Sequence, residues 1–121
     1  MKHNVLFVCG KNRLRSPTAE QVFAHWPGVE TASAGTGHDA DCPVSAELID
    51  WADTVLVMEP AHRARIAARF QRQLLGKRIA VLGIPDKYAY MAPELVRLLE
   101  KKVPPYLPAC ADAGRGAGRS R

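Results

Sequence analysis

Short apolar stretches alternate with helical periods along most of the chain. The stretches lie at residues 4–8, 29–34, 54–58 and 79–82, and each is followed by a segment whose apolar side chains recur every three or four positions. The first stretch is almost continuously apolar, as expected for a central strand that is covered on both faces. Repeated units of a strand and a helix predict a parallel sheet with packed helices, an α/β fold.

Residues that favour helix ends bound the four predicted helices. Ser16 is a candidate N-cap and Pro17 a first-turn residue for the first helix, which Pro27 and Gly28 stop. The other predicted boundaries are Ser45 as the cap of a short second helix, Pro60 and Gly76 as the ends of the third, and Pro93 and Pro104 as the ends of the fourth.

The length and composition predict one domain. A chain of 121 residues matches a single compact unit, which we expect to span 1–108. Residues 109–121 have no periodicity and are rich in Gly and Arg, which predicts a disordered basic tail. Contents of 47% hydrophobic and 24% charged residues exclude a wholly disordered or fibrous chain.

The cysteine content indicates the cellular compartment, and the net charge indicates the kind of partner. Three cysteines without a secretory apolar segment predict a reducing compartment, the cytoplasm. No apolar run approaches the ~20 residues of a membrane span. The net charge of +5 suits an anionic partner, either a phosphate ester or a nucleic acid.

The segment CGKNRLRSP at residues 9–17 lies between a predicted buried strand and a helix N-terminus. Ligands of open parallel sheets bind at this carboxyl edge, where loop N–H groups and the positive end of a helix attract anions. We therefore expect the loop to form a cup for a tetrahedral phosphate, closed by a bidentate guanidinium. The predicted phosphate-binding residues are Gly10, Lys11, Asn12, Arg13, Leu14 and Arg15.

The same positive field would favour the thiolate form of Cys9 and make it a nucleophile. Ser16 is placed to donate its hydroxyl to the sulfur, which would help the thiolate leave when a phosphocysteine is hydrolysed. A lone cysteine at a strand end is more often a core residue. The fixed offsets from Cys9 to Arg15 and Ser16 nevertheless favour the functional interpretation.

The sequence resembles the low-molecular-weight protein tyrosine phosphatase family over most of residues 4–103. The resemblance rests on residues 5–9, 12, 15–17, 19–20, 33–36, 57–58 and the loop around Asp86. It implies a four-stranded parallel sheet in the order 2-1-3-4 with helices on both faces. It also implies a hydrolase that dephosphorylates proteins or small anionic phosphoesters through a phosphocysteine, with no cofactor.

The resemblance further implies roles for single residues. Cys9 matches the nucleophile, Arg15 binds phosphate, and Asp86 matches the general acid on a late loop. Asn12 and Ser33 match positions that hydrogen-bond to keep the phosphate loop in shape. The chain departs from the family at Lys87, where a proline usually follows the acid.

The sequence defines the substrate less closely than it defines the reaction. The segment after Gly35 is shorter than in typical members of the family and lacks the aromatic residue that usually walls the pocket. Tyr88 is the candidate for the opposite wall. Positive charge from Arg13 and Lys87 predicts a preference for acidic or doubly charged phosphoesters.

Two other functions and a metal site can be weighed against this interpretation. An arsenate reductase on the same fold needs closely paired resolving cysteines, which Cys42 and Cys110 do not provide. A noncatalytic phosphate- or nucleic-acid-binding module would use the arginines of the third helix, but no interleaved aromatic residues accompany them. His38 and Cys42 have no further ligands beside them in the sequence, so no metal is expected. The oligomeric state is left open.

Overall fold

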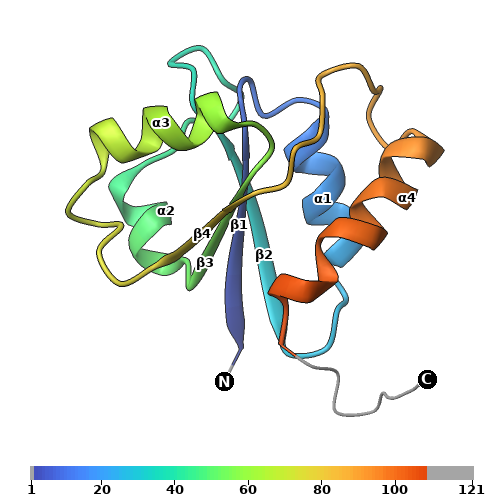
Figure 1. The fold of residues 1–121 in the computed structure, drawn as a ribbon, viewed down its shortest axis with the longest axis horizontal. Coiled ribbons are helices and arrows are strands. Elements are labelled where there is room, and N and C mark those ends of the chain that lie inside the picture. Colours follow the sequence, from blue (N-terminus) through green and yellow to red (C-terminus); the bar gives the residue numbers. More distant parts are fainter. Residues whose placement is uncertain (1, 109–121) are drawn as a thin grey trace.

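The computed structural model describes residues 2–108 and contains one four-stranded parallel sheet (Figure 1). The strand order is β2-β1-β3-β4, which confirms the predicted order and fold class. The strands are β1 His3–Cys9, β2 Val29–Gly35, β3 Thr54–Val57 and β4 Arg78–Val81. β1 lies between β2 and β3, and the side chains of residues 5–8 are fully buried, as predicted for a central strand.

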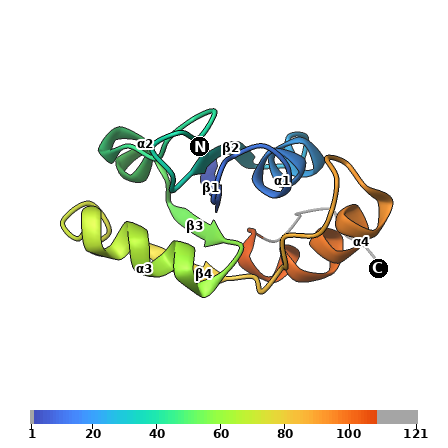
Figure 2. The same cartoon turned by 90° about the horizontal axis from the view of Figure 1, so that it is seen from above.

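Helices cover both faces of the sheet. The helical elements are α1 Arg15–Phe23, α2 Ala46–Trp51, α3 Pro60–Arg69, α4 Pro93–Lys102 and the short 3-10 helix η1 Pro104–Tyr106. Figure 2 shows α1 and α4 on one face and α2 and α3 on the other. The carboxyl ends of the strands therefore meet at one edge between two helical layers.

Alternation along β1 supplies both layers with core residues. Val5 and Phe7 face the α1 and α4 layer, where Phe7 stacks on Phe23 with ring centroids 6.1 Å apart. Leu6 and Val8 face the α2 and α3 layer. Cys9 belongs to the first cluster and lies where the strand enters the loop.

The predicted helix ends are correct in part. Ser45 caps α2 as predicted, because its hydroxyl accepts the N–H of Leu48. The prediction that Ser16 caps α1 is wrong: the helix begins at Arg15, its N-cap is Leu14, and no side chain among residues 2–108 caps it. The hydroxyl of Ser16 is instead engaged at the sulfur of Cys9.

The third helix is shorter than predicted. α3 ends at Arg69, and turns lead to Gly76, whose φ of 78° is the expected left-handed conformation. Leu74 is still buried although it lies outside the helix. None of the helices within residues 2–108 combines the length and apolar character needed to cross a membrane. The tail predicted at 109–121 lies outside the described residues.

Candidate active site

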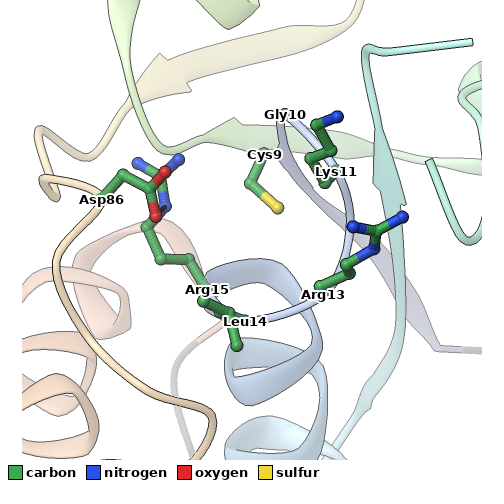
Figure 3. A pocket seen from close by; sticks show the side chains of 7 residues that line it. All are labelled: Cys9, Gly10, Lys11, Arg13, Leu14, Arg15 and Asp86. Atoms are coloured by element: carbon green, nitrogen blue, oxygen red, sulfur yellow. Dashed lines mark ion pairs between the residues drawn. The ribbon is translucent and has the colours of Figure 1, made fainter. Parts of the chain in front are cut away.

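A pocket of about 260 Å³ opens at the carboxyl edge of the sheet, where β1 passes into α1 (Figure 3). Its lining residues are Cys9, Gly10, Lys11, Arg13, Leu14, Arg15 and Asp86. The first six come from the end of β1, the loop that follows and the start of α1, while Asp86 comes from the segment after β4. The structure thus brings most of the predicted site residues to one place.

Backbone hydrogen bonds give the loop its shape. Three successive loop carbonyls accept N–H groups from the segment after β2, at distances of 2.9, 2.9 and 3.0 Å. The pairs are Thr36 with Cys9, Gly37 with Gly10, and Asp41 with Lys11. Because the carbonyls turn outward to this segment, the loop amides are left for the inner side, where they suit an anion.

The sulfur of Cys9 has two polar neighbours within hydrogen-bonding distance. Sγ lies 2.9 Å from Oγ of Ser16 and 3.2 Å from the N–H of Asn12. Oγ of Ser16 also lies 3.0 Å from Oδ1 of Asn12, so its single hydrogen can be donated either to this oxygen or to a thiolate at Cys9. Asn12 is buried and has a φ of 58°, so a polar side chain that tolerates the left-handed region occupies the turn. These contacts place Asn12 inside the loop, beside both the sulfur and the Ser16 hydroxyl.

Arg15 is 4% exposed, and its guanidinium is held by three groups. Nη1 donates to the carbonyl oxygen of Ile84 at 2.8 Å and lies 3.2 Å from Oε1 of Glu59. Nε lies 3.7 Å from Oδ1 of Asp86. A buried cation needs such partners, and here two carboxylates and a carbonyl compensate it.

Asp86 lies at the open side of the pocket. Its side chain is 66% exposed, so the carboxyl group is accessible to a bound molecule. Figure 3 shows Asp86 and the Arg15 guanidinium on one side of Cys9, and Lys11 and Arg13 on the other. A phosphate in the cup would therefore have the carboxyl group at its outer face.

Two residues near Arg15 were not predicted from the sequence. Glu59 caps α3, and its backbone N–H donates to Nδ1 of His62 at 3.1 Å. Nε2 of His62 lies 3.5 Å from Oε1 of Glu59. Burial lowers the pKa of His62, and the positive charge of Arg15 lowers it further, which favours the neutral ring. An acid directly after an apolar strand and before a proline was the available signal.

The hydroxyl of Ser33 hydrogen-bonds to α1 and not, as expected, to the phosphate loop. Its hydroxyl donates to Oε1 of Glu20 on α1, so it joins β2 to that helix. The reason is its place on β2, where Phe7 of the central strand is its register partner, two residues before the strand reaches Cys9. Its predicted contact with the loop is therefore corrected.

Tyr88 does not form the predicted pocket wall. Its ring packs against the apolar cluster of the α1 and α4 layer, and Nζ of Lys87 lies 5.6 Å from its centroid. Within residues 2–108, the pocket's only large apolar lining side chain is Leu14. The ring of Tyr88 therefore contributes to the apolar core and not to the rim of the pocket.

The positive rim is paired with acidic side chains. Nζ of Lys11 lies 2.5 Å from Asp39, and Nε of Arg13 lies 3.2 Å from Asp41. The hydrogen bond from Lys11 is the main cause that lowers the pKa of Asp39. Both acids come from the segment after β2, so that segment offsets the charge of Arg13, one of the two cations expected to favour doubly anionic substrates.

The described residues hold no group of three or more His, Cys, Asp or Glu side chains arranged for a metal ion. Cys42 is exposed, and Cys110 lies outside the described part. The pocket itself brings together a thiol, a guanidinium and a carboxyl group, with the Ser16 hydroxyl beside the sulfur.

No family model matches the chain. A protein-arginine-phosphatase of Geobacillus stearothermophilus is 32% identical over 94 residues, which cover 58% of this chain and 64% of that protein. The match therefore spans less than two thirds of this curated relative.

Solved structures share the fold over most of the chain. The tyrosine phosphatase Wzb from Escherichia coli K30 in complex with phosphate superposes with a TM-score of 0.70 at 23% identity, covering 88% of this chain and 96% of Wzb. A low-molecular-weight protein tyrosine phosphatase from T. tengcongensis gives 0.65 at 24% identity, covering 83% and 97%. By its strand order and these similarities, the chain shares the fold of the low-molecular-weight protein tyrosine phosphatases.

Proposed function

We propose that the protein is a cysteine-dependent phosphatase that acts on phosphorylated proteins or small anionic phosphoesters through a phosphocysteine. The observation that carries this proposal is the position of Cys9 Sγ within a loop that Arg15 closes. A thiolate there is next to the place where loop amides and a guanidinium would hold a phosphoryl group. A noncatalytic binding module would have no use for Ser16 beside the sulfur or for a carboxyl group at the mouth.

In the first step the Cys9 thiolate attacks phosphorus. The P–S bond forms as the P–O bond to the leaving group breaks, and Asp86 donates its proton to the departing oxygen. Arg15 and the loop amides stabilise the negative charge on the other phosphoryl oxygens. The products are the free alcohol or phenol and a phosphocysteine.

In the second step water attacks the phosphocysteine. The Asp86 carboxylate takes a proton from the water as the P–S bond breaks, and inorganic phosphate is released. The thiolate leaves with the hydroxyl of Ser16 and the N–H of Asn12 beside it, at 2.9 and 3.2 Å. The enzyme returns to its starting protonation state with Asp86 protonated.

The substrate class is proposed to be phosphorylated side chains, with phosphotyrosine first. The curated relative makes phosphoarginine a second candidate, because its name states a protein-arginine-phosphatase. The pocket rim offers Leu14 in place of an aromatic wall, so it gives phosphotyrosine little ring contact. We therefore expect slow hydrolysis of phosphotyrosine and propose a direct comparison with phosphoarginine peptides.

Arsenate reduction is not favoured, because the similar proteins reported above are phosphatases. A cysteine nucleophile works only while it is reduced, which suits the cytoplasm expected from the sequence. Nucleic acid is not a proposed partner.

The test is hydrolysis of a generic aryl phosphate by the wild type, Cys9→Ser and Arg15→Lys, with Cys42→Ser as a matched control cysteine. We expect activity in the wild type and in Cys42→Ser, none in Cys9→Ser, and severe loss in Arg15→Lys because an ammonium cannot form the guanidinium fork. Rapid acid quench with labelled substrate should trap phosphate on Cys9. Activity retained by Cys9→Ser, or label on another residue, would refute the mechanism.

A further inference from the structure

We infer that Glu59 is a positioning residue that orients the guanidinium of Arg15 toward the phosphate. The inference rests on the proposed function and adds a residue that lies outside the phosphate loop. Glu59 follows β3, while Arg15 begins α1. Their ion pair joins α3, on one face of the sheet, to α1 on the other (Figure 2).

One guanidinium nitrogen is held by a hydrogen bond and an ion pair. Nη1 carries two hydrogens, and two acceptors lie near it, the Ile84 carbonyl oxygen at 2.8 Å and Oε1 of Glu59 at 3.2 Å. Because the guanidinium is planar, fixing Nη1 at two points fixes the plane and its rotation. The edge formed by Nε and Nη2 becomes available for a bidentate contact with phosphate oxygens when Asp86 turns from Nε to the leaving group.

Glu59 is itself held in place. It is the N-cap of α3, where its carbonyl oxygen accepts the N–H of His62 at 3.0 Å and the His62 ring accepts its backbone N–H at 3.1 Å. Its carboxylate also lies 3.5 Å from Nε2 of His62, so both the backbone and the side chain of Glu59 have a partner in the first turn of α3. The helix cap therefore transmits the position of α3 to the guanidinium.

A second carboxylate is needed because Asp86 cannot hold Arg15 throughout the reaction. Asp86 pairs with Nε in this structure, yet a general acid must be protonated and must turn to the leaving group. At that moment a guanidinium that is 4% exposed would lose a counterion. Glu59 keeps a negative charge at Nη1, so the two carboxylates have separate tasks.

The variants Glu59→Ser and Glu59→Gln separate positioning from capping. Serine is a good N-cap but cannot reach Arg15, whereas glutamine keeps an acceptor at the same reach without the charge. The readouts are the melting temperature, the dissociation constant of orthovanadate measured by calorimetry, and kcat and KM with an aryl phosphate. We expect Glu59→Ser to remain folded at the assay temperature with a lower melting temperature, because the buried guanidinium loses a partner, and to lose about 10- to 100-fold in vanadate affinity and in kcat/KM. Glu59→Gln should stay within about fivefold of the wild type.

A double-mutant comparison tests whether the effect passes through Arg15. In the Arg15→Lys background, Glu59→Ser should weaken vanadate binding by less than about twofold, because the fork is already absent. Full loss in that background, equal losses for the Ser and Gln variants, or wild-type behaviour of Glu59→Ser would each overturn the inference. An inactive wild type that binds vanadate in a Glu59-dependent way would refute the proposed function and leave the positioning role standing.

Discussion

Gly35 passes so close to the phosphate loop that a β-carbon at this position would lie 2.7 Å from the carbonyl oxygen of Gly10. The same carbon would lie 2.6 Å from Cβ of Ala40 and 3.0 Å from the amide nitrogen of Asn12. Only a glycine lets the end of β2 support the loop at this distance. The rigidity of the cup therefore depends on a residue that contributes no side chain to it.

We predict that Gly35→Ala displaces the loop and lowers kcat/KM by at least about 10-fold, since small misplacement of reacting groups can cost 10²-fold. Orthovanadate affinity should fall with it. The control is Gly76→Ala, which introduces left-handed strain at a φ of 78° but meets no neighbouring atom. That variant should lose about 1–2 kcal/mol of stability while keeping its activity. Equal activity losses in the two variants would mean that Gly35 acts through global stability.

The local part of the site could be predicted from the sequence because its residues are consecutive. Cys9 and Ser16 are seven positions apart across one strand-to-helix connection, so their contact follows from the loop and the helix that it begins. The alternation of strands and helices likewise predicted the sheet, since each unit buries its own apolar residues. Helix-capping preference alone predicted Ser16 as the N-cap of α1. That preference takes no account of the Cys9 sulfur, which the Ser16 hydroxyl contacts instead.

The remote part could not be predicted because it depends on tertiary contacts. The Ile84 contact uses a backbone carbonyl 69 positions from Arg15, and a carbonyl carries no sequence signal. Glu59 lies beside Arg15 only because β1 and β3 are neighbours in the sheet. The hydrogen-bond partner of Ser33 could not be predicted either, because its hydroxyl donates to Glu20 on the helix that packs against β2.

Removing the hydroxyl of Ser16 should slow the second step more than the first. The hydroxyl lies 2.9 Å from Sγ and would stabilise the thiolate as it leaves phosphorus. A hydrogen bond to a charged group contributes ~1.5–3 kcal/mol, so we predict that Ser16→Ala slows dephosphorylation about 10- to 100-fold. Stopped-flow assays with p-nitrophenyl phosphate should then show a burst of nitrophenol and accumulated phosphoenzyme. A slower first step without a burst would assign Ser16 to thiolate formation instead.

The stability of the protein should fall in mild acid because of His62. Its pKa in the folded state lies below the ordinary value of 6.5, chiefly through burial. As pH falls below 6.5, the unfolded chain binds a proton at His62 before the folded protein does, so stability present above that pH is lost. His62→Gln keeps a side chain suited to the third helical position of a capping box but does not titrate. Its melting temperature should fall less than that of the wild type between pH 7 and 5; parallel pH profiles would contradict the assignment.

The acidic partners at the rim should suppress a preference for doubly anionic substrates. Asp39 and Asp41 pair with Lys11 and Arg13, so neither cation is free for a substrate. We predict that Asp39→Asn combined with Asp41→Asn lowers KM for an acidic phosphopeptide about two- to fivefold at low salt, and that added salt removes the gain. KM for a neutral aryl phosphate is the internal control and should change little. If Arg13→Ala alone raises KM for acidic peptides in the wild type, the cation is available despite its partner.

The role of Asp86 can be tested through the leaving group. An acid that protonates the departing oxygen matters most when the alcohol is weakly acidic, because a poor leaving group cannot depart as an anion. General acid–base assistance is worth about 10²–10⁴-fold, so Asp86→Asn should lose that much with alkyl phosphates and much less with nitrophenyl phosphates.

Asparagine can still contact Nε of Arg15 at the present 3.7 Å spacing, which separates proton transfer from placement of the loop. Orthovanadate affinity should remain within a fewfold of the wild type, because Glu59 still holds the guanidinium at Nη1. An equal rate loss across leaving groups of very different acidity would show that Asp86 shapes the pocket and donates no proton.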